Sequence, residues 1–269
     1  WHSSGLFTGL VPGNYNVRIR DAANITCVIV LNSALQITQP PVLNATVSAV
    51  MVTCNGANDG QINITSPSGG YGTYEYSING GGSWQLAGSF ANLAPGIYDV
   101  RIRDAVNTGC VIILNGALPM TQPAVLNATI SSTNVTCFGA DDGSITITNP
   151  TGGYGTYEYS IDGTNWQITG SFQSLMAGVY SPSIRDRANT GCVIILNPSL
   201  VITEPAILSA SLSSTNITCN GASDGTITIT GISGGYGTYQ YSVTGGAFWQ
   251  PMGTFTNLMP DTYDVRIRD

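Results

Sequence analysis

The chain repeats itself with a period of about 83 residues, and this self-similarity constrains its fold more than any other feature. Two series of cysteines and one of tryptophans keep the spacing: Cys27, Cys110 and Cys192; Cys54, Cys137 and Cys219; Trp1, Trp84, Trp166 and Trp249. A period of this length indicates one structural unit used several times in tandem, rather than one large domain.

The period divides the 269 residues into four segments. Residues 1–41 correspond to the C-terminal half of a repeat, 42–123 and 124–206 are full repeats, and 207–269 are the N-terminal part of another. Because Trp1 aligns with Trp84 and Asp269 aligns with Asp104, we expect further repeats on both sides of this sequence.

Each repeat has the pattern of an all-β domain. Apolar residues alternate with polar ones at Ile62 and Ile64, and again at Tyr98, Val100 and Ile102. Gly, Asn, Asp and Pro interrupt the pattern at short intervals, and no stretch shows a convincing helical period. About seven short strands per repeat predict tandem Ig-like β-sandwiches.

This fold predicts an ion pair. In an Ig-like sandwich the strand with Tyr74 and the strand with Tyr98 are neighbours. Their tyrosines then face the core, and Glu75, Arg101 and Arg103 face outward on adjacent strands. We expect Glu75 to pair with one of the two arginines across the strands.

The second full repeat offers the same pair in Glu158 and Arg185, whereas Gln240 removes the carboxylate in the last repeat. An exposed pair of this kind contributes at most about 1 kcal/mol to stability.

The order of motifs in a repeat resembles the SprB-type repeat. The motifs are Cys-x-Gly-x-x-Asp-Gly at 54–60, Gly-Gly-x-Gly-x-Tyr-x-Tyr-Ser at 69–77, Leu-x-x-Gly-x-Tyr-x-Val-x-Ile-x-Asp at 93–104, then Gly-Cys at 109–110 and Thr-x-Pro at 121–123. That family occurs in very long cell-surface adhesins of Bacteroidota, including adhesins of gliding motility. The resemblance covers essentially the whole chain and implies export, an Ig-like repeat and a surface or adhesive role.

Composition excludes several functions. Charged residues make up 9% of the chain, there is no lysine, and the formal net charge is −7. Binding to a phosphate backbone requires a basic patch, so we expect no nucleic-acid partner. No apolar run approaches the roughly 18 residues of a membrane span, so we expect no membrane insertion.

Catalysis finds no support in the sequence. His2 is the only histidine, and the chain has no Ser-His-Asp set, no phosphate-binding glycine loop and no metal-binding cluster. Every notable residue recurs, whereas a catalytic site is normally unique. We therefore expect no enzyme activity, no cofactor and no metal.

The six cysteines, two per repeat, indicate disulfides in an oxidising compartment rather than a zinc site. Two pairings are open. Pairing within repeats joins Cys54 to Cys110 and Cys137 to Cys192, and we favour it. The alternative pairing across the links uses all six cysteines: Cys27–Cys54, Cys110–Cys137 and Cys192–Cys219.

Two further motifs have alternative interpretations. The Asp-Gly turns at 59–60, 142–143 and 224–225 could bind calcium, but one or two carboxylates per turn favour a simple hydrogen-bonded turn. Aromatic residues in the glycine-rich loops could form an exposed sugar-binding surface: Tyr71, Trp84, Tyr154 and Trp166.

The sequence therefore favours a non-enzymatic, extracellular stalk segment of a long bacterial surface adhesin or filament. Its expected partners are neighbouring repeats, other copies associating laterally into a fibre, and surface glycans. Two alternatives remain: a carbohydrate-binding array on a secreted polysaccharide-degrading enzyme, and a secreted matrix protein.

Overall fold

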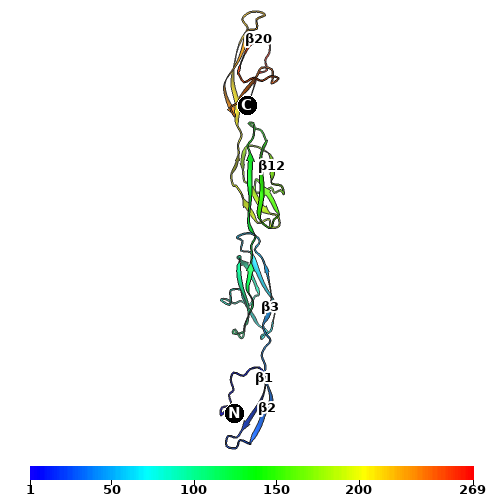
Figure 1. The fold of residues 1–269 in the computed structure, drawn as a ribbon, viewed down its shortest axis with the longest axis vertical. Coiled ribbons are helices and arrows are strands. Elements are labelled where there is room, and N and C mark those ends of the chain that lie inside the picture. The colour runs from blue at the N-terminus through cyan, green and yellow to red at the C-terminus, as the bar shows by residue number, and fades with distance from the viewer. The chain divides into compact units, whose positions relative to one another are not determined.

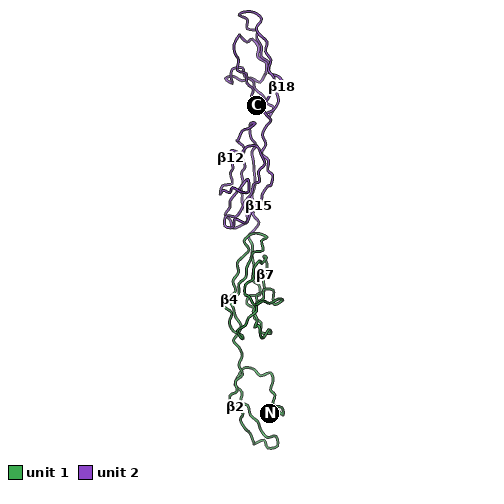
Figure 2. Tube along the Cα trace, turned by 180° about the vertical axis from the view of Figure 1, so that it is seen from behind, with its two compact units in different colours: residues 1–122 green, residues 123–269 purple.

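The computed structural model describes all 269 residues as β-strands joined by turns, with no helix (Figure 1). The chain forms two compact units, residues 1–122 and residues 123–269 (Figure 2). The predicted all-β class and the tandem β-sandwich repeats are confirmed. No helix in the structure has the length and hydropathy needed to cross a membrane.

The first unit contains eight strands: β1 (Gly13–Arg20), β2 (Val28–Ile37), β3 (Asn44–Val50), β4 (Gly60–Ser68), β5 (Tyr74–Ser77), β6 (Ser89–Leu93), β7 (Gly96–Asp104) and β8 (Val111–Met120). The strands β1 and β2 form an antiparallel pair. The other six form two antiparallel sheets with strand orders β3-β4-β6 and β5-β7-β8.

This topology is Ig-like, since the two sheets correspond to the A-B-E and C-F-G sheets of that fold. We expected about seven strands in a full repeat, and the structure has six in residues 42–123 and eight in residues 124–206, where two strands are each split in two. The strand with Tyr74 lies beside the strand with Tyr98, because β5 pairs with β7. The prediction of sheet neighbours from the Ig-like order was therefore correct.

The core lies between the two sheets. Ile62 on β4 and Val100 and Ile102 on β7 have no exposed surface, and all three belong to one cluster of buried residues. Alternate residues of β4 and β7 are buried, as expected for strands with one face on a core. The period-2 pattern of the sequence thus corresponds to the buried face of each sheet.

A tyrosine corner marks the start of β7. The hydroxyl of Tyr98 donates a hydrogen bond to the carbonyl of Ala94, at 2.9 Å. The same bond, with its four-residue separation, occurs in all four repeats: Tyr15 to Val11, Tyr180 to Met176 and Tyr263 to Met259. This contact is a recurrent feature of Ig-like sandwiches.

The second unit contains thirteen strands: β9 (Ala124–Thr133), β10 (Gly143–Gly153), β11 (Tyr157–Ser160), β12 (Ser171–Leu175), β13 (Gly178–Tyr180), β14 (Ser183–Asp186), β15 (Val193–Ile195), β16 (Leu200–Ile202), β17 (Ala206–Thr215), β18 (Gly225–Gly235), β19 (Gln240–Ser242), β20 (Thr254–Leu258) and β21 (Arg266–Arg268). Its sheets follow the same plan, with orders β12-β10-β9 and β11-β14-β15, and then β17-β18-β20 and β19-β21, and β13 and β16 form a further antiparallel pair.

Two strands of this plan are interrupted in the second full repeat: the counterpart of β7 is split into β13 and β14, and that of β8 into β15 and β16. Pro182 lies between β13 and β14. Proline has no backbone N–H and cannot donate to a strand ladder. Its carbonyl instead accepts hydrogen bonds from the backbone N–H groups of Leu196 and Asn197, at 2.8 and 3.3 Å.

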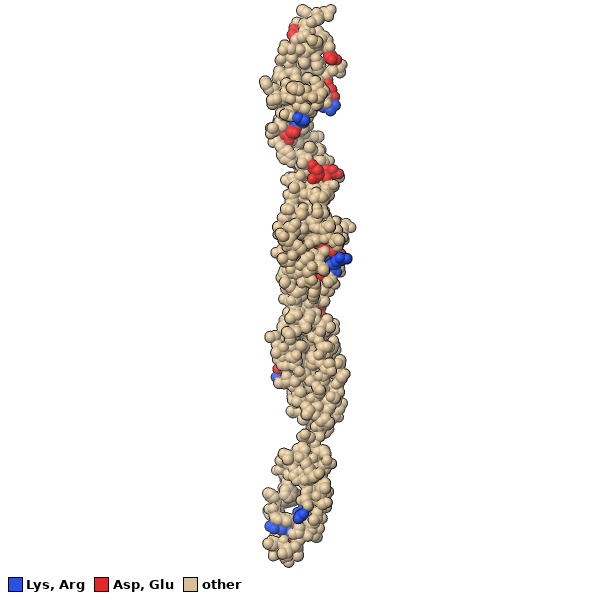
Figure 3. Space-filling view, turned by 45° about the vertical axis from the view of Figure 1, so that its right-hand side comes forward, with Lys and Arg blue, Asp and Glu red and all other residues tan.

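Charged side chains are sparse on the surface. In the view of Figure 3, most of the surface carries no charged group, and blue and red groups often lie beside one another. The structure has five ion pairs, and each involves an arginine. Five of the eight arginines therefore form ion pairs within the protein.

Candidate functional site

The Gly-Gly-Tyr-Gly loop is held in place by a buried carboxylate. Asp104, at the end of β7, has no exposed surface. Its carboxylate accepts hydrogen bonds from the backbone N–H groups of Asn107 at 2.9 Å, Tyr71 at 2.6 Å and Val106 at 2.9 Å. These bonds lower the pKa of Asp104, and they join the loop to the turn between β7 and β8.

The two leading glycines of this loop are required by space and by backbone conformation. Gly69 has φ +79°, and a Cβ atom there would lie 2.1 Å from the carbonyl oxygen of Val42. Gly70 has φ +59°, and a Cβ atom there would lie 2.7 Å from Oδ2 of Asp104. Only glycine fits both positions without displacing its neighbours.

The sequence analysis did not predict the structural role of Asp104, which is to hold the Gly-Gly-Tyr-Gly loop. Its counterparts Asp186 and Asp269 accept hydrogen bonds from Tyr154 and Tyr236, the tyrosines of the equivalent loops. The recurrence of this aspartate in every repeat was the available signal, but a recurring aspartate alone does not reveal which backbone groups it binds.

In the Asp-Gly turns, the aspartate carboxylate accepts hydrogen bonds from a threonine six residues earlier in the chain. In the first full repeat, Asp59 accepts hydrogen bonds from the hydroxyl and the backbone N–H of Thr53. These bonds lower the pKa of Asp59, with the hydroxyl as the larger cause. The same threonine–aspartate pairs recur as Thr136–Asp142 and Thr218–Asp224.

Both oxygens of each such carboxylate therefore have a partner within the turn. No group of three or more His, Cys, Asp or Glu side chains is placed to hold a metal ion. The geometry favours the interpretation of these motifs as hydrogen-bonded turns.

Acid is expected to destabilise the repeats through these carboxylates. A carboxyl with a lower pKa in the folded state binds fewer protons there, so its stabilising effect is complete above the unfolded pKa of about 3.9 and is lost as pH falls through the folded pKa. Asp59, Asp104, Asp142 and Asp224 all have lowered pKa values.

We expect the urea midpoint, followed by circular dichroism, to be constant above about pH 5 and to fall below about pH 4. Asp59→Asn should make the acid-dependent decrease smaller, and Asp141→Asn, which removes the same charge, serves as its control. A midpoint that rises on acidification would contradict the assignment.

The links between repeats are bonded to the repeat that precedes them. At the end of the first full repeat, the backbone N–H of Val52 donates to the carbonyl of Thr121 at 3.1 Å, and the N–H of Gly56 donates to Oε1 of Gln122 at 2.7 Å. At the end of the second, the N–H of Gly139 donates to Oε2 of Glu204 at 2.6 Å. The Thr-Gln-Pro and Thr-Glu-Pro segments are therefore ordered parts of the fold.

An arginine connects a tryptophan and a glutamate on the outer face of the second sheet. Residues Glu75 on β5 and Arg103 on β7 are directly opposite in register, and Nε of Arg103 lies 2.6 Å from Oε2 of Glu75. The guanidinium Cζ of Arg103 lies 4.4 Å from the centroid of the Trp84 ring. We call these three residues the arginine cluster.

The arginine cluster recurs with small changes. Arg185 lies 2.6 Å from Glu158 and covers Trp166, while Arg187 lies 4.0 Å from the same glutamate. In the last repeat, Arg268 covers Trp249 and donates hydrogen bonds to Gln240, the residue expected to remove the ion pair. The amide thus replaces the carboxylate as the acceptor, so the arrangement of the cluster is kept.

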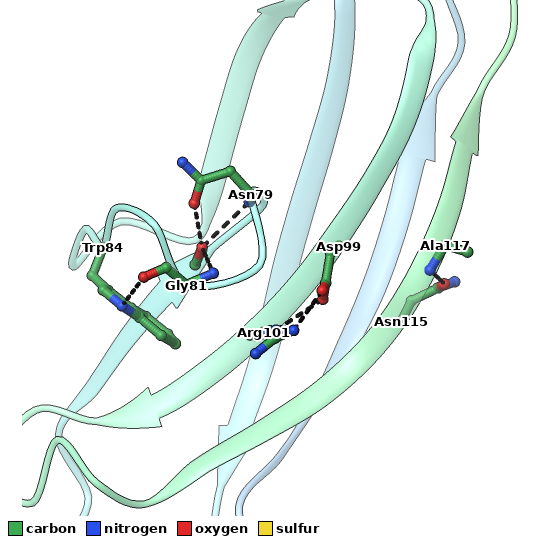
Figure 4. A network of polar contacts seen from close by, with 8 residues as sticks. Asn79, Gly81, Trp84, Asp99, Arg101, Asn115 and Ala117 are labelled. Atoms are coloured by element: carbon green, nitrogen blue, oxygen red, sulfur yellow. Dashed lines mark hydrogen bonds and ion pairs between the residues drawn. The ribbon is translucent and has the colours of Figure 1, made fainter.

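The other outward arginine pairs within its own strand. Nη2 of Arg101 lies 2.6 Å from Oδ2 of Asp99, two residues earlier on β7 (Figure 4). This contact lowers the pKa of Asp99. Of the two arginines considered for Glu75, it is therefore Arg103 that the structure places beside it.

The four candidate sugar-binding aromatics differ in their surroundings. Tyr71 and Tyr154 are 61% and 50% exposed. Trp84 and Trp166 are half-buried, and each has an arginine over its ring. The indole N–H of Trp84 also donates to the carbonyl of Gly81, at 3.0 Å (Figure 4). These tryptophans therefore already use an aromatic face for contacts within their repeats.

The cross-strand pair should show a measurable coupling. In a double-mutant cycle of Glu75→Ala and Arg103→Ala, we expect about 0.5–1 kcal/mol of interaction energy, read from hydrogen exchange of the β5 and β7 amides. The cycle of Glu75→Ala with Arg101→Ala is the control and should give a coupling near zero. Equal couplings in the two cycles would contradict the pairing.

The cysteines do not follow the favoured pairing. Cys54 and Cys192 are disulfide-bonded, whereas Cys27, Cys110, Cys137 and Cys219 are free and exposed. Neither Cys54–Cys110 nor Cys137–Cys192 is formed, and the alternative pairing across the links is not formed either.

Geometry explains why the pairing within a repeat was wrong. Cys110 directly precedes β8, and the turn that contains Cys54 is bonded to Gln122, just beyond the other end of β8. A ten-residue strand spans about 33 Å, whereas the Cα atoms of a disulfide lie within about 7 Å.

The fold and its recurring contacts define a class, the tandem β-sandwich repeat proteins. Within that class, the model of the SprB repeat matches three segments of the chain, residues 46–83, 129–165 and 211–248. Such repeats are structural and are associated with cell-surface proteins. No curated protein and no solved structure matches the chain.

Proposed function

We propose that the chain is a structural and adhesive stalk segment of a long extracellular surface adhesin or filament, of the kind that includes adhesins of gliding motility. The observation that carries this proposal is the bonding of the Thr-x-Pro links at 121–123 and 203–205 to the repeats that they end. Hydrogen bonds from Gly56 to Gln122 and from Gly139 to Glu204 restrain the links. A restrained link transmits a pull from one repeat to the next.

Proline adds to this restraint. Pro123 and Pro205 end the two links, and proline fixes its own φ and keeps the preceding residue extended. A link of this kind behaves as a semi-rigid spacer, unlike a flexible Gly/Ser linker. This property suits a stalk that must hold a binding tip away from the cell.

The disulfide-bonded cysteines and the lack of lysine also support an extracellular location. Disulfides persist in oxidising compartments and are rare in the cytosol. The chain has disulfide-bonded cysteines, no lysine and few charged side chains. Lysine and arginine are the cleavage sites of trypsin-like proteases, so a chain with eight arginines and no lysine offers few of them.

Electron microscopy of intact cells tests the proposal. An antibody against residues 42–123, coupled to gold, should label thin fibres at the cell surface, and cells that lack the gene should show no label. Label confined to the medium or the periplasm would overturn the proposal and favour a module of a secreted polysaccharide-degrading enzyme.

Lateral association into a fibre is a part of this proposal that the edge strands support. The strand β8 lies at the edge of its sheet, and Ile113 on it is 57% exposed. Exposed apolar edge strands favour contacts between chains. Sedimentation of the purified chain at rising concentration should show reversible association, and a strictly monomeric chain would contradict it.

A further inference from the structure

A tyrosine hydroxyl joins two consecutive repeats in the second unit. The hydroxyl of Tyr236, in the Gly-Gly-Tyr-Gly loop of the last repeat, donates a hydrogen bond to the backbone carbonyl of Val135, at 3.0 Å. The two residues are 101 positions apart, and Val135 belongs to the repeat before. The contact therefore bridges the junction without involving the link itself.

The loop that carries Tyr236 is fixed to its own repeat. The backbone N–H of Tyr236 donates to Asp269. Gly234, two residues earlier, has φ +82° and lies so close to the carbonyl of Ile207 that a Cβ atom would be 2.0 Å from it. The ring of Tyr236 is thus presented from a constrained loop beside the first strand of its repeat.

The acceptor is equally constrained. Val135 has no exposed surface, and its backbone N–H donates to the carbonyl of Thr203 in the outgoing link, at 3.0 Å. Thr203 in turn donates its N–H to Oδ1 of Asn134, at 3.0 Å. The backbone N–H of Val135 therefore binds the link, and its carbonyl binds the next repeat.

We propose that Tyr236, in the Gly-Gly-Tyr-Gly loop of the last repeat, is a docking residue for the preceding repeat of the same chain, and that it sets the orientation of these two repeats. This inference deepens the proposed stalk function and rests on it for its biological meaning. Tyr236 is 67% exposed, so its hydroxyl, rather than buried ring area, makes the contact. The loop aromatic, considered above for sugar binding, then serves contact between repeats.

Removing the hydroxyl alone tests the proposal. In Tyr236→Phe, made in the full 269-residue chain with its disulfide intact, hydrogen exchange in residues 133–142 and 203–207 should be about fivefold faster, as expected for the loss of one hydrogen bond. Tyr263→Phe is the matched control. It removes one hydroxyl hydrogen bond within the last repeat, to the carbonyl of Met259, so exchange in residues 133–142 and 203–207 should not change.

A second measurement reports on orientation. Residual dipolar couplings from residues 124–206 and 207–269 should fit one alignment tensor in the unchanged chain and two different tensors in Tyr236→Phe. Unchanged exchange and a single tensor in Tyr236→Phe would overturn the docking role. Because both measurements use purified protein, their failure is distinguishable from failure of the stalk proposal, which depends on the location of the label on cells.

Discussion

Gly69→Ala is expected to destabilise the repeat at 42–123 by about 2–5 kcal/mol. A non-glycine residue in the left-handed region costs about 1–2 kcal/mol, and overpacking adds about 1–3 kcal/mol. Both effects apply here, because Gly69 has φ +79° and its new Cβ atom would lie 2.1 Å from the backbone oxygen of Val42. A backbone oxygen cannot swing aside as a flexible side chain can.

Gly109→Ala is the matched control for this substitution. Gly109 lies in a turn of the same repeat, and a Cβ atom there meets nothing within 4 Å. Hydrogen exchange of the β4 and β7 amides, measured in the full chain, reports the local free energy of unfolding for the repeat. Equal effects of the two alanines on this free energy would show that the close approach at Gly69 has been misjudged.

Ile102→Ala should cost a similar amount, about 2–5 kcal/mol, for a different reason. Ile102 on β7 has no exposed surface and packs in the cluster between the two sheets. Truncation removes buried methyl and methylene groups and leaves a cavity, which together account for this range. Ile97, on the same strand, is 75% exposed, so Ile97→Ala should change stability by less than about 0.5 kcal/mol.

The same exchange experiment measures both isoleucine variants, and calorimetry gives an independent check. In Ile102→Ala, the thermal transition of one repeat should move to a lower temperature while the others stay in place. A uniform shift of every transition would mean that the repeats do not unfold separately, and would contradict the expectation that each has its own core.

The fold was predictable because its determinants are local and repeated. Alternation at Tyr98, Val100 and Ile102 places these residues on one face of a strand, and glycine and proline mark its ends. The pairing of β5 with β7 then followed from the Ig-like order, so Glu75 could be placed opposite an arginine. Which arginine it would be depends on register, which the pattern alone does not fix.

The cysteine pairing was not predictable from spacing. Every pairing considered uses the same period, so the period cannot distinguish between them. The distinction comes from which end of the sandwich each cysteine occupies, and the long strand β8 separates Cys110 from the turn of Cys54. This is a property of the folded repeat and leaves no mark on the sequence near either cysteine.

The junction contacts were missed for a related reason. Gly56 binds Gln122 across 66 residues, and Tyr236 binds Val135 across 101. Neither contact belongs to a strand ladder or to a local turn motif, so neither has a characteristic spacing. Sequence reasoning identified the links by their prolines and the loop by its glycines, but it could not show that they meet the turn between the first two strands of a repeat.

Each Asp-Gly turn finds the hydrogen-bond donors of its carboxylate within its own repeat, and this has a genetic consequence. Asp59 is satisfied by Thr53, six residues away, and Asp142 and Asp224 are satisfied in the same way by their own threonines. A copy inserted by unequal recombination would therefore bring the partners of its own carboxylates with it. A change in copy number would then lengthen or shorten the molecule without a compensating substitution at these turns.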